Sequence, residues 1–179
     1  LFEYNMGTIC NLNVTLSNTD KDTDTIAPGK GLAGIALANA NGGMDGLIED
    51  CTVTMTVNRT FGELAGDLGI NGISSGGTIR NCIAKLSIVL DANSSSAGSG
   101  SIRVSGIGSG TNFSLVEHCL VLGGISVQST QQSVHFSGIS NGTARNSACA
   151  LEKLTVVSRS SRLDPYEYFT LSAAKALSN

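Results

Sequence analysis

The chain has 179 residues, which suffices for one domain with a sizeable core. Charged residues make up only 14% and aromatic residues 4%, while glycine is frequent at 22 residues. This composition disfavours helices, which prefer Ala, Leu, Glu, Lys and Arg, and it favours stacked strands joined by glycine corners. The net charge of −3, with no basic stripe, leaves nucleic-acid binding without electrostatic support.

The chain opens inside a repeat. Residues 1–5 are typical of the tail of a short strand, and residues 7–12 form the second half of a recurring phrase. No apolar run approaches the length of a membrane span, and no secretory signal is visible. We therefore expect the chain to be a piece of a longer polypeptide.

The recurring phrase is clearest at residues 71–82, where it reads NGISSGGTIRNC. Further copies lie at residues 33–51, 105–119 and 137–147, in addition to the half copy at residues 7–12. A repeat of roughly 30 to 40 residues is typical of a solenoid, a propeller or an array.

Each repeat is predicted to contain one long strand and one short strand. Period-two alternation, as in the segment CTVTMTV, indicates the long strands. These are expected at residues 8–17, 47–58, 78–91, 115–128 and 144–158. The short strands are expected around the Gly-Ile dipeptides, at Ile35, Ile73, Ile107 and Ile139.

The sequence thus predicts an all-β fold over residues 1–158. The expected architecture is a single-stranded parallel β-helix (β-solenoid), right-handed and of about five rungs. Residues 159–179 break the pattern, and we expect an irregular or helical cap there, or the start of a further unit. For the aromatic residues at 166–169, a sugar-binding platform is the alternative to a cap.

Two adjacent columns of the aligned repeats test this stacking. One column contains Cys10, Glu49, Arg80, Glu117 and Arg145. Since stacked strands lie about 4.8 Å apart, its alternating charges would attract each other. The next column contains Asn11, Asp50, Asn81, His118 and Asn146, whose side chains are expected to hydrogen-bond along the stack. We interpret His118 as a member of this ladder, because no nucleophile or acid partner for a catalytic histidine can be named.

The last repeat does not align without an insertion. Matching residues 153–157 to residues 85–89 requires about two extra residues after Ser147, and we expect a bulge near Cys149 to absorb them.

Five cysteines are present, and an odd number argues against a closed disulfide framework. Cys51, Cys82 and Cys119 share one repeat position, with Leu12 and Ser147 in the flanking copies. Free cysteine behaves as a small buried hydrophobic residue, so we predict an interior column. Redox chemistry or metal ligation is the alternative, but neither a CxxC motif nor a Cys/His spacing supports it.

Asp20, Asp22 and Asp24 alternate in the first loop, which is how a calcium-binding loop begins. However, Thr25 stands where the turn glycine would be needed, and Gly31 where the bidentate glutamate would be needed. We therefore expect a solvated acidic loop and no metal site.

Glu49, Asp50 and Glu117 lie near one another in register, and paired carboxylates are what a glycosidase or lyase requires. The charge ladder already accounts for them, and aromatic subsites are missing. The sequence therefore predicts no enzymatic activity, no catalytic or cofactor-binding residue, and no cofactor.

The phrase Gly-Ile-x-x-Gly-Gly-Thr-Ile-x-Asn-Cys resembles the GLUG repeat family. The matching segments are Gly72–Cys82 most closely, then Gly138–Ser147, Gly106–Cys119 and Gly34–Cys51. Such repeats are similar to segments of large bacterial surface proteins, including adhesins and some IgA-specific metallopeptidases. No His-Glu-x-x-His motif occurs here, so no catalytic residue of those peptidases is implied. The repeats here are longer than those of the family, and the second glycine of the signature is mostly absent.

The resemblance implies an extracellular or cell-surface location in bacteria. The expected function is a non-catalytic structural stalk or adhesion module of a secreted or cell-surface protein. Expected partners are host glycans or surface proteins, neighbouring domains of a larger polypeptide, and further copies in end-to-end self-association. Two alternatives remain open. A carbohydrate-active β-helix of the lyase or hydrolase type would require a cleft lined by Asp, Glu, Arg and aromatic residues. A self-assembling fibre subunit would use unpaired strand edges.

Overall fold

A computed structural model describes residues 1–19, 31–41, 44–61, 66–92, 100–108, 113–130, 132–139 and 144–157. Within these residues every regular element is a β-strand and no helix occurs, so the all-β class predicted from composition is confirmed. The region predicted to be a cap or a further unit, residues 159–179, lies outside the described residues.

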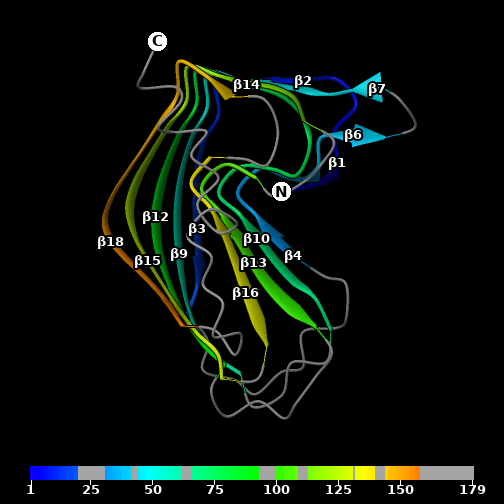
Figure 1. Cartoon of the computed structure of the whole chain (residues 1–179). Helices are drawn as coiled ribbons and strands as arrows, with labels where there is room; N and C mark the ends of the chain where they lie inside the picture. The colour runs from blue at the N-terminus through cyan, green and yellow to red at the C-terminus, as the bar shows by residue number, and fades with distance from the viewer. Residues whose placement is uncertain are drawn as a thin grey trace.

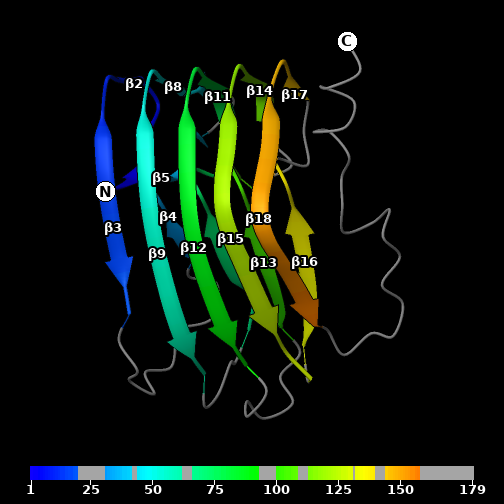
Figure 2. The ribbon, with the colours of Figure 1, turned by 90° about the vertical axis from the view of Figure 1, so that its left-hand side faces the viewer.

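Three parallel sheets contain most of the strands (Figures 1 and 2). Sheet I contains β4 (Gly31–Ala33), β10 (Leu68–Asn71), β13 (Ser101–Ser105) and β16 (Ser133–Ser137). Sheet II contains β2 (Thr8–Cys10), β8 (Leu47–Glu49), β11 (Gly77–Arg80), β14 (Phe113–Glu117) and β17 (Ala144–Arg145). Sheet III contains β3 (Asn13–Asn18), β9 (Thr52–Thr60), β12 (Ile83–Asp91), β15 (Leu120–Gln128) and β18 (Ala148–Val157).

Two small pairs complete the described strands. The strand β1 (Phe2–Tyr4) pairs in parallel with β5 (Ala36–Ala38), and β6 (Ala40–Asn41) pairs antiparallel with β7 (Met44–Asp45). The β6–β7 pair projects from the end of sheet II that lies away from sheet III (Figure 1).

The chain visits the three large sheets in a constant order. From residue 31 onward each passage runs through sheet I, then sheet II, then sheet III, and every strand pairs in parallel with its counterpart one passage away. The long strands of sheet III consequently lie side by side in chain order, as Figure 2 shows. This is the spatial meaning of the sequence repeat.

The prediction of one long strand per repeat was wrong, because each predicted strand is two strands in different sheets. The chain turns between sheets II and III at one column of residues with positive φ. These are Asn11 (55°), Asp50 (54°), Asn81 (50°), His118 (53°) and Asn146 (46°). Asn, Asp and His are enriched in this left-handed region, which explains the composition of the column. At each turn two successive residues, such as Arg80 and Asn81, face outward and shift the apolar alternation by one residue, and the sequence prediction passed over this signal.

The predicted short strands are displaced rather than absent. Each strand of sheet I ends on the residue before a Gly-Ile dipeptide, so the dipeptide forms the corner between sheets I and II. Glycine is required in this dipeptide because the backbone of the next repeat lies too close for a side chain. A Cβ at Gly72 would lie 1.8 Å from the carbonyl oxygen of Gly106, and one at Gly106 would lie 2.0 Å from that of Gly138. The isoleucines that follow are completely buried, and they are Ile35, Ile73, Ile107 and Ile139.

The insertion in the last repeat is one residue, not about two. Gly123 pairs with Leu151 and Gly124 pairs with Lys153, which leaves Glu152 as the extra residue of a bulge. The bulge therefore lies three residues beyond the predicted position near Cys149. Since one inserted residue reverses the inward-outward alternation, it returns Leu154 to the interior column of Ile125.

Candidate functional site

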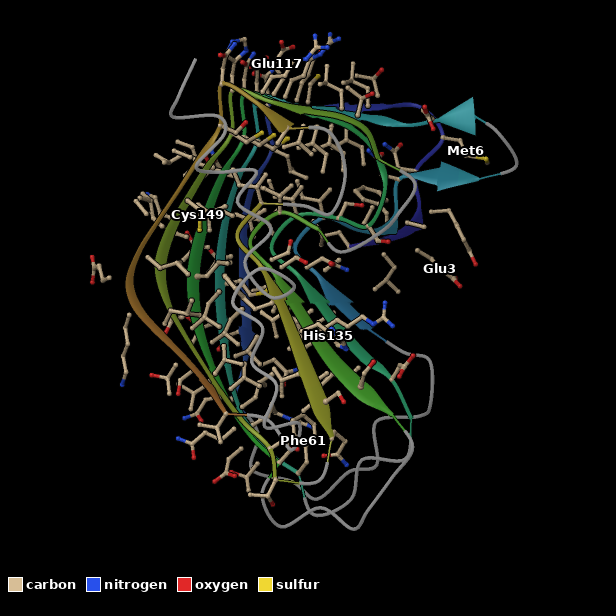
Figure 3. The ribbon with its side chains drawn as sticks, in the orientation of Figure 1. Glu3, Met6, Phe61, Glu117, His135 and Cys149 are labelled. Carbon is tan, nitrogen blue, oxygen red and sulfur yellow. The ribbon has the colours of Figure 1, made fainter. Side chains whose placement is uncertain are left out.

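One end of the stack holds a cavity of about 1170 Å³. It lies where β1 and β5 face β4 and β10, and Arg103 of β13 also lines it. Apolar side chains line much of the cavity, and they are Leu1, Phe2, Leu16, Leu32, Leu37 and Leu68. Its polar lining includes Glu3, Tyr4, Asp67 and Arg103. Glu3 and His135 both project on the side of sheet I that faces away from sheet III (Figure 3).

A hydrogen-bond network at sheet I fixes the acidic side chain in this lining. The Asp67 carboxylate accepts hydrogen bonds from the Ser101 backbone N–H at 2.7 Å and from the Ser101 hydroxyl at 3.0 Å. The Arg103 Nε in turn donates to the Ser101 hydroxyl oxygen at 3.3 Å. The backbone bond first, and then the hydroxyl bond, lower the pKa of Asp67, so the group is a carboxylate at neutral pH.

Apolar residues are exposed at this end although their counterparts are buried. Because Phe2 pairs with Ala36, Leu1 lies in line with the buried Ile35 and is nevertheless 74% exposed. Phe2 is 46% exposed and Tyr4 56% exposed. Composition did not reveal this exposure, since these residues belong to the same repeat columns as core residues.

The cysteine column lies in the interior, as predicted. Cys51, Cys82 and Cys119 are buried, and all five cysteines are free thiols. Each of the three thiols donates to the carbonyl oxygen two residues earlier, and the distances are 3.1 Å to Glu49, 2.9 Å to Arg80 and 3.3 Å to Glu117. Ser147 repeats the arrangement, with its hydroxyl 2.8 Å from the Arg145 carbonyl oxygen.

Burial keeps most of these thiols protonated. It raises the pKa of Cys51, and it raises the pKa of Cys149, which is half-buried, to about 11. Hydrogen bonding with the neighbouring Cys119 thiol, together with burial, raises the pKa of Cys82. The same hydrogen bond lowers the pKa of Cys119, while burial opposes that shift. The buried thiols of this column pack as small apolar side chains.

The charged column at the corner is confirmed in register. Arg80 pairs with Glu49 on one side and with Glu117 on the other, and its Nε lies 3.7 Å from the Glu117 Oε2. Arg80 therefore separates the two carboxylates that a glycosidase reading would have brought together. In the adjacent column the Asn146 amide lies 3.2 Å from the His118 Nε2, which agrees with the predicted ladder.

A second amide pair, which the sequence analysis missed, lies inside the stack. The buried Asn5 donates to the side-chain oxygen of buried Asn39 at 2.6 Å, and Asn39 donates to the backbone carbonyl oxygens of Gly46 and Thr78. The sequence contains little indication of this pair, because the next repeat has a glycine, Gly77, and no asparagine next to Asn39. A Cβ there would lie 2.0 Å from the Asn39 carbonyl oxygen.

Two sequence interpretations fall outside the described residues. These are the acidic loop of Asp20, Asp22 and Asp24, and the aromatic segment at residues 166–169. In the part of the chain that the structure describes, no three His, Cys, Asp or Glu side chains gather where they could hold a metal ion. The same part contains no helix long and apolar enough to cross a membrane.

Comparison of the chain with protein-family models, with curated proteins and with solved structures finds no match.

Proposed function

We propose that this chain is a non-catalytic structural stalk or adhesion module of a secreted or cell-surface bacterial protein. Its architecture would be a right-handed β-solenoid of about five rungs, related to the GLUG repeats that the sequence resembles. In this role the stack holds its loops at a fixed distance from a surface, and the loops or an outer face make the contacts.

The observation that carries this proposal is the repeated parallel pairing of equivalent strands. In sheet III the chain stacks β3, β9, β12, β15 and β18 with one bulge, and the described core beneath them contains no charged side chain. Repeats that contact only their neighbours give an elongated body whose length is set by the repeat number. Such a body supports a mechanical role better than a chemical one.

The outer face of sheet III supports weak contacts over a broad area. Along β9 the outward positions are Thr52, Thr54, Thr56, Asn58 and Thr60. Hydroxyl and amide groups of this kind adapt to many polar ligands. The residues that pair with these positions on β12 and β15 include Ile83, Lys85 and Leu122. The outer face is therefore hydroxyl-rich on β9 and contains apolar and basic residues on the following strands.

The test is binding of the purified chain to arrays of glycans and of host surface proteins. A specific ligand that is lost on substitution of outward residues of β9, with the folded state retained, supports an adhesion module. A folded protein that binds nothing on either array would support the stalk and remove the adhesive role.

A carbohydrate-active protein is the second candidate, because the cavity near β1 has the lining that this alternative required. Glu3, Asp67 and Arg103 line it together with Phe2 and Tyr4. Saccharides stack on aromatic rings and hydrogen-bond to carboxylates and guanidinium groups. Release of reducing sugar from a polysaccharide panel, lost in Asp67→Asn, would establish the activity. An unchanged rate in that variant would place any activity elsewhere.

End-to-end assembly into a fibre is favoured by a different observation. The strands β2 and β3 contain no charged residue and no proline, and such strands are suited to pairing with a strand of another copy. Sedimentation velocity over a range of concentrations would detect such growth, and a constant sedimentation coefficient would rule it out.

A further inference from the structure

The corner between sheets II and III carries two adjacent columns of polar side chains that run along the stack. Together they form the outer edge at the top of Figures 1 and 2, where Figure 3 labels Glu117. All of these residues are exposed except Glu49 and Glu117, which are half-buried. We call them the corner ridge, and they are Glu49, Arg80, Glu117 and Arg145 in the first column and Asp50, Asn81, His118 and Asn146 in the second.

The charges of the first column are only partly neutralised within the chain. The Arg80 Nε lies 3.7 Å from the Glu117 Oε2, and the two side chains are still 45% and 24% exposed. Glu49 and Arg145 occupy the two ends of the charged series, and neither takes part in an ion pair among the residues that the structure describes. The ridge can therefore pair with further charges, acidic at one position and basic at another.

The series of charges along the first column is its own complement when it is reversed. Consider a two-fold axis that is perpendicular to the stack and passes between the levels of Arg80 and Glu117. It brings a second ridge against the first with the strand order reversed, so that Arg80 faces Glu117 of the second copy and Glu49 faces its Arg145. Each contact occurs twice, which gives four opposite-charge pairs. Because both ridges have the same spacing of about 4.8 Å between levels, all four pairs match at once.

The second column fits the same arrangement. Asn81 faces His118 of the second copy, and Asp50 faces its Asn146, so each side chain meets a group with which it can form a hydrogen bond. Within the chain, the Asn146 amide already lies 3.2 Å from the His118 Nε2. Amide and imidazole groups of this column are therefore suited to bonding across a single level.

The parallel alternative is unfavourable. A two-fold axis that runs along the stack would keep the strand order but exchange the columns, so that the first column of each copy faces the second column of the other. Glu49 would then face Asp50 of the second copy, and this like-charge contact would occur twice. Like charges placed opposite each other select against an arrangement.

We propose that the corner ridge is a docking surface for a second copy of this chain, which pairs with it side by side in the reversed strand order. The ridge supplies eight residues a side, whereas a stable interface has about 20–30. Each exposed ion pair contributes little, so the expected dissociation constant of the dimer is about 1 mM. This pairing does not require the stalk or adhesion role, and it differs from end-to-end assembly because it uses side chains and not strand edges.

The experiment measures dimerisation of the whole chain by sedimentation equilibrium up to about 1 mM at low salt. Two isosteric double variants remove opposite halves of the charge series. Glu49→Gln with Glu117→Gln leaves only arginines in the first column, and Arg80→Gln with Arg145→Gln leaves only glutamates. Each variant alone loses all four opposite-charge pairs and is expected to dimerise about tenfold more weakly than the natural chain.

Mixing the two variants provides the sharper measurement. In the reversed order, the arginines of one variant face the glutamates of the other, so two of the four pairs return. The mixture should therefore associate about threefold or more tightly than either variant alone, and salt should abolish the difference. Circular dichroism spectra show that both variants remain folded.

A control variant separates the ridge from the net charge. Lys85→Gln with Lys153→Gln changes the net charge as much as the arginine variant does, and both lysines are exposed away from the ridge. This control should dimerise within about twofold of the natural chain.

The proposal is overturned if the natural chain remains a monomer at about 1 mM, or if the lysine control loses as much affinity as the arginine variant. A mixture that associates no better than its components would also overturn it. So would association that all the variants share equally, including open-ended growth through β2 and β3, because those strands contain no charge that the variants remove.

Discussion

The first and the middle levels of this stack contain the same kinds of residue in the same columns, yet they bury them differently. Leu1 is 74% exposed, whereas Ile73 and Ile107 in the same column are completely buried. A middle strand has a neighbour on both sides, whereas β1 has one neighbour, β5, among the described strands. The stability of a repeat protein is approximately the sum of the stabilities of its repeats and of the interfaces between them. The same substitution should therefore change the free energy of unfolding much less in the first level than in a middle level.

The largest contrast is expected between two identical substitutions in this column. Ile107→Asp places an unpaired charge in the interior and should cost about 4 kcal/mol or more, which abolishes cooperative unfolding. Leu1→Asp should change the free energy of unfolding by no more than about 0.5 kcal/mol. Urea denaturation followed by circular dichroism measures both. A mild effect of Ile107→Asp would mean that the Gly-Ile corner is not interior.

The glycine column should show the next largest effect. In Gly72→Ala the new Cβ meets the Gly106 carbonyl oxygen at 1.8 Å, so a neighbouring backbone must move, at a cost of roughly 1–3 kcal/mol. Gly69→Ala is the control, because no atom lies within 4 Å of its Cβ position. That variant should be neutral or stabilise by about 0.4–1 kcal/mol, through the unfolded state. Equal losses in thermal denaturation would contradict the stacking argument.

The corner residues should respond alike at both places, which sharpens the comparison. Asn11 and Asn81 have φ values of 55° and 50°, so the left-handed strain is local and independent of neighbours. Replacing either by alanine should cost about 1 kcal/mol, and replacing either by glycine should cost less. If Asn11→Ala costs much less than Asn81→Ala, side-chain contacts along the column are more important than the φ angle.

The smallest effect is expected at Asp67, which is exposed. Its pKa is lowered by the Ser101 hydrogen bonds, so its stabilising contribution is present above the unfolded pKa of about 3.9 and is lost as pH falls through the lowered value. Asp67→Asn should therefore destabilise slightly at pH 7, and the difference from the natural chain should shrink at low pH and at high salt. Denaturation curves measured across acidic pH test this prediction. A stability difference between Asp67→Asn and the natural chain that grows as the pH falls would contradict it.

The sequence by itself determined the strand class, the repeat and most of the register. It placed Arg80 between Glu49 and Glu117 and placed Cys51, Cys82 and Cys119 in one buried column, because stacked strands put equivalent residues at one depth. Equivalent residues of successive repeats therefore lie next to each other in the stack, as the sequence repeat predicts.

Tertiary structure decided where the chain turns and where the stack is open. Only the strand pairing shows that the chain changes sheets at Asn81, and the same pairing shows that one residue, Glu152, is inserted in the last repeat where the sequence suggested about two. The exposure of Leu1 and the cavity beside β4 depend on which neighbours are present, since identical columns are buried in the middle of the stack and open at its edge. The type of a residue indicates its column in the repeat, but its exposure depends on which strands pack beside it.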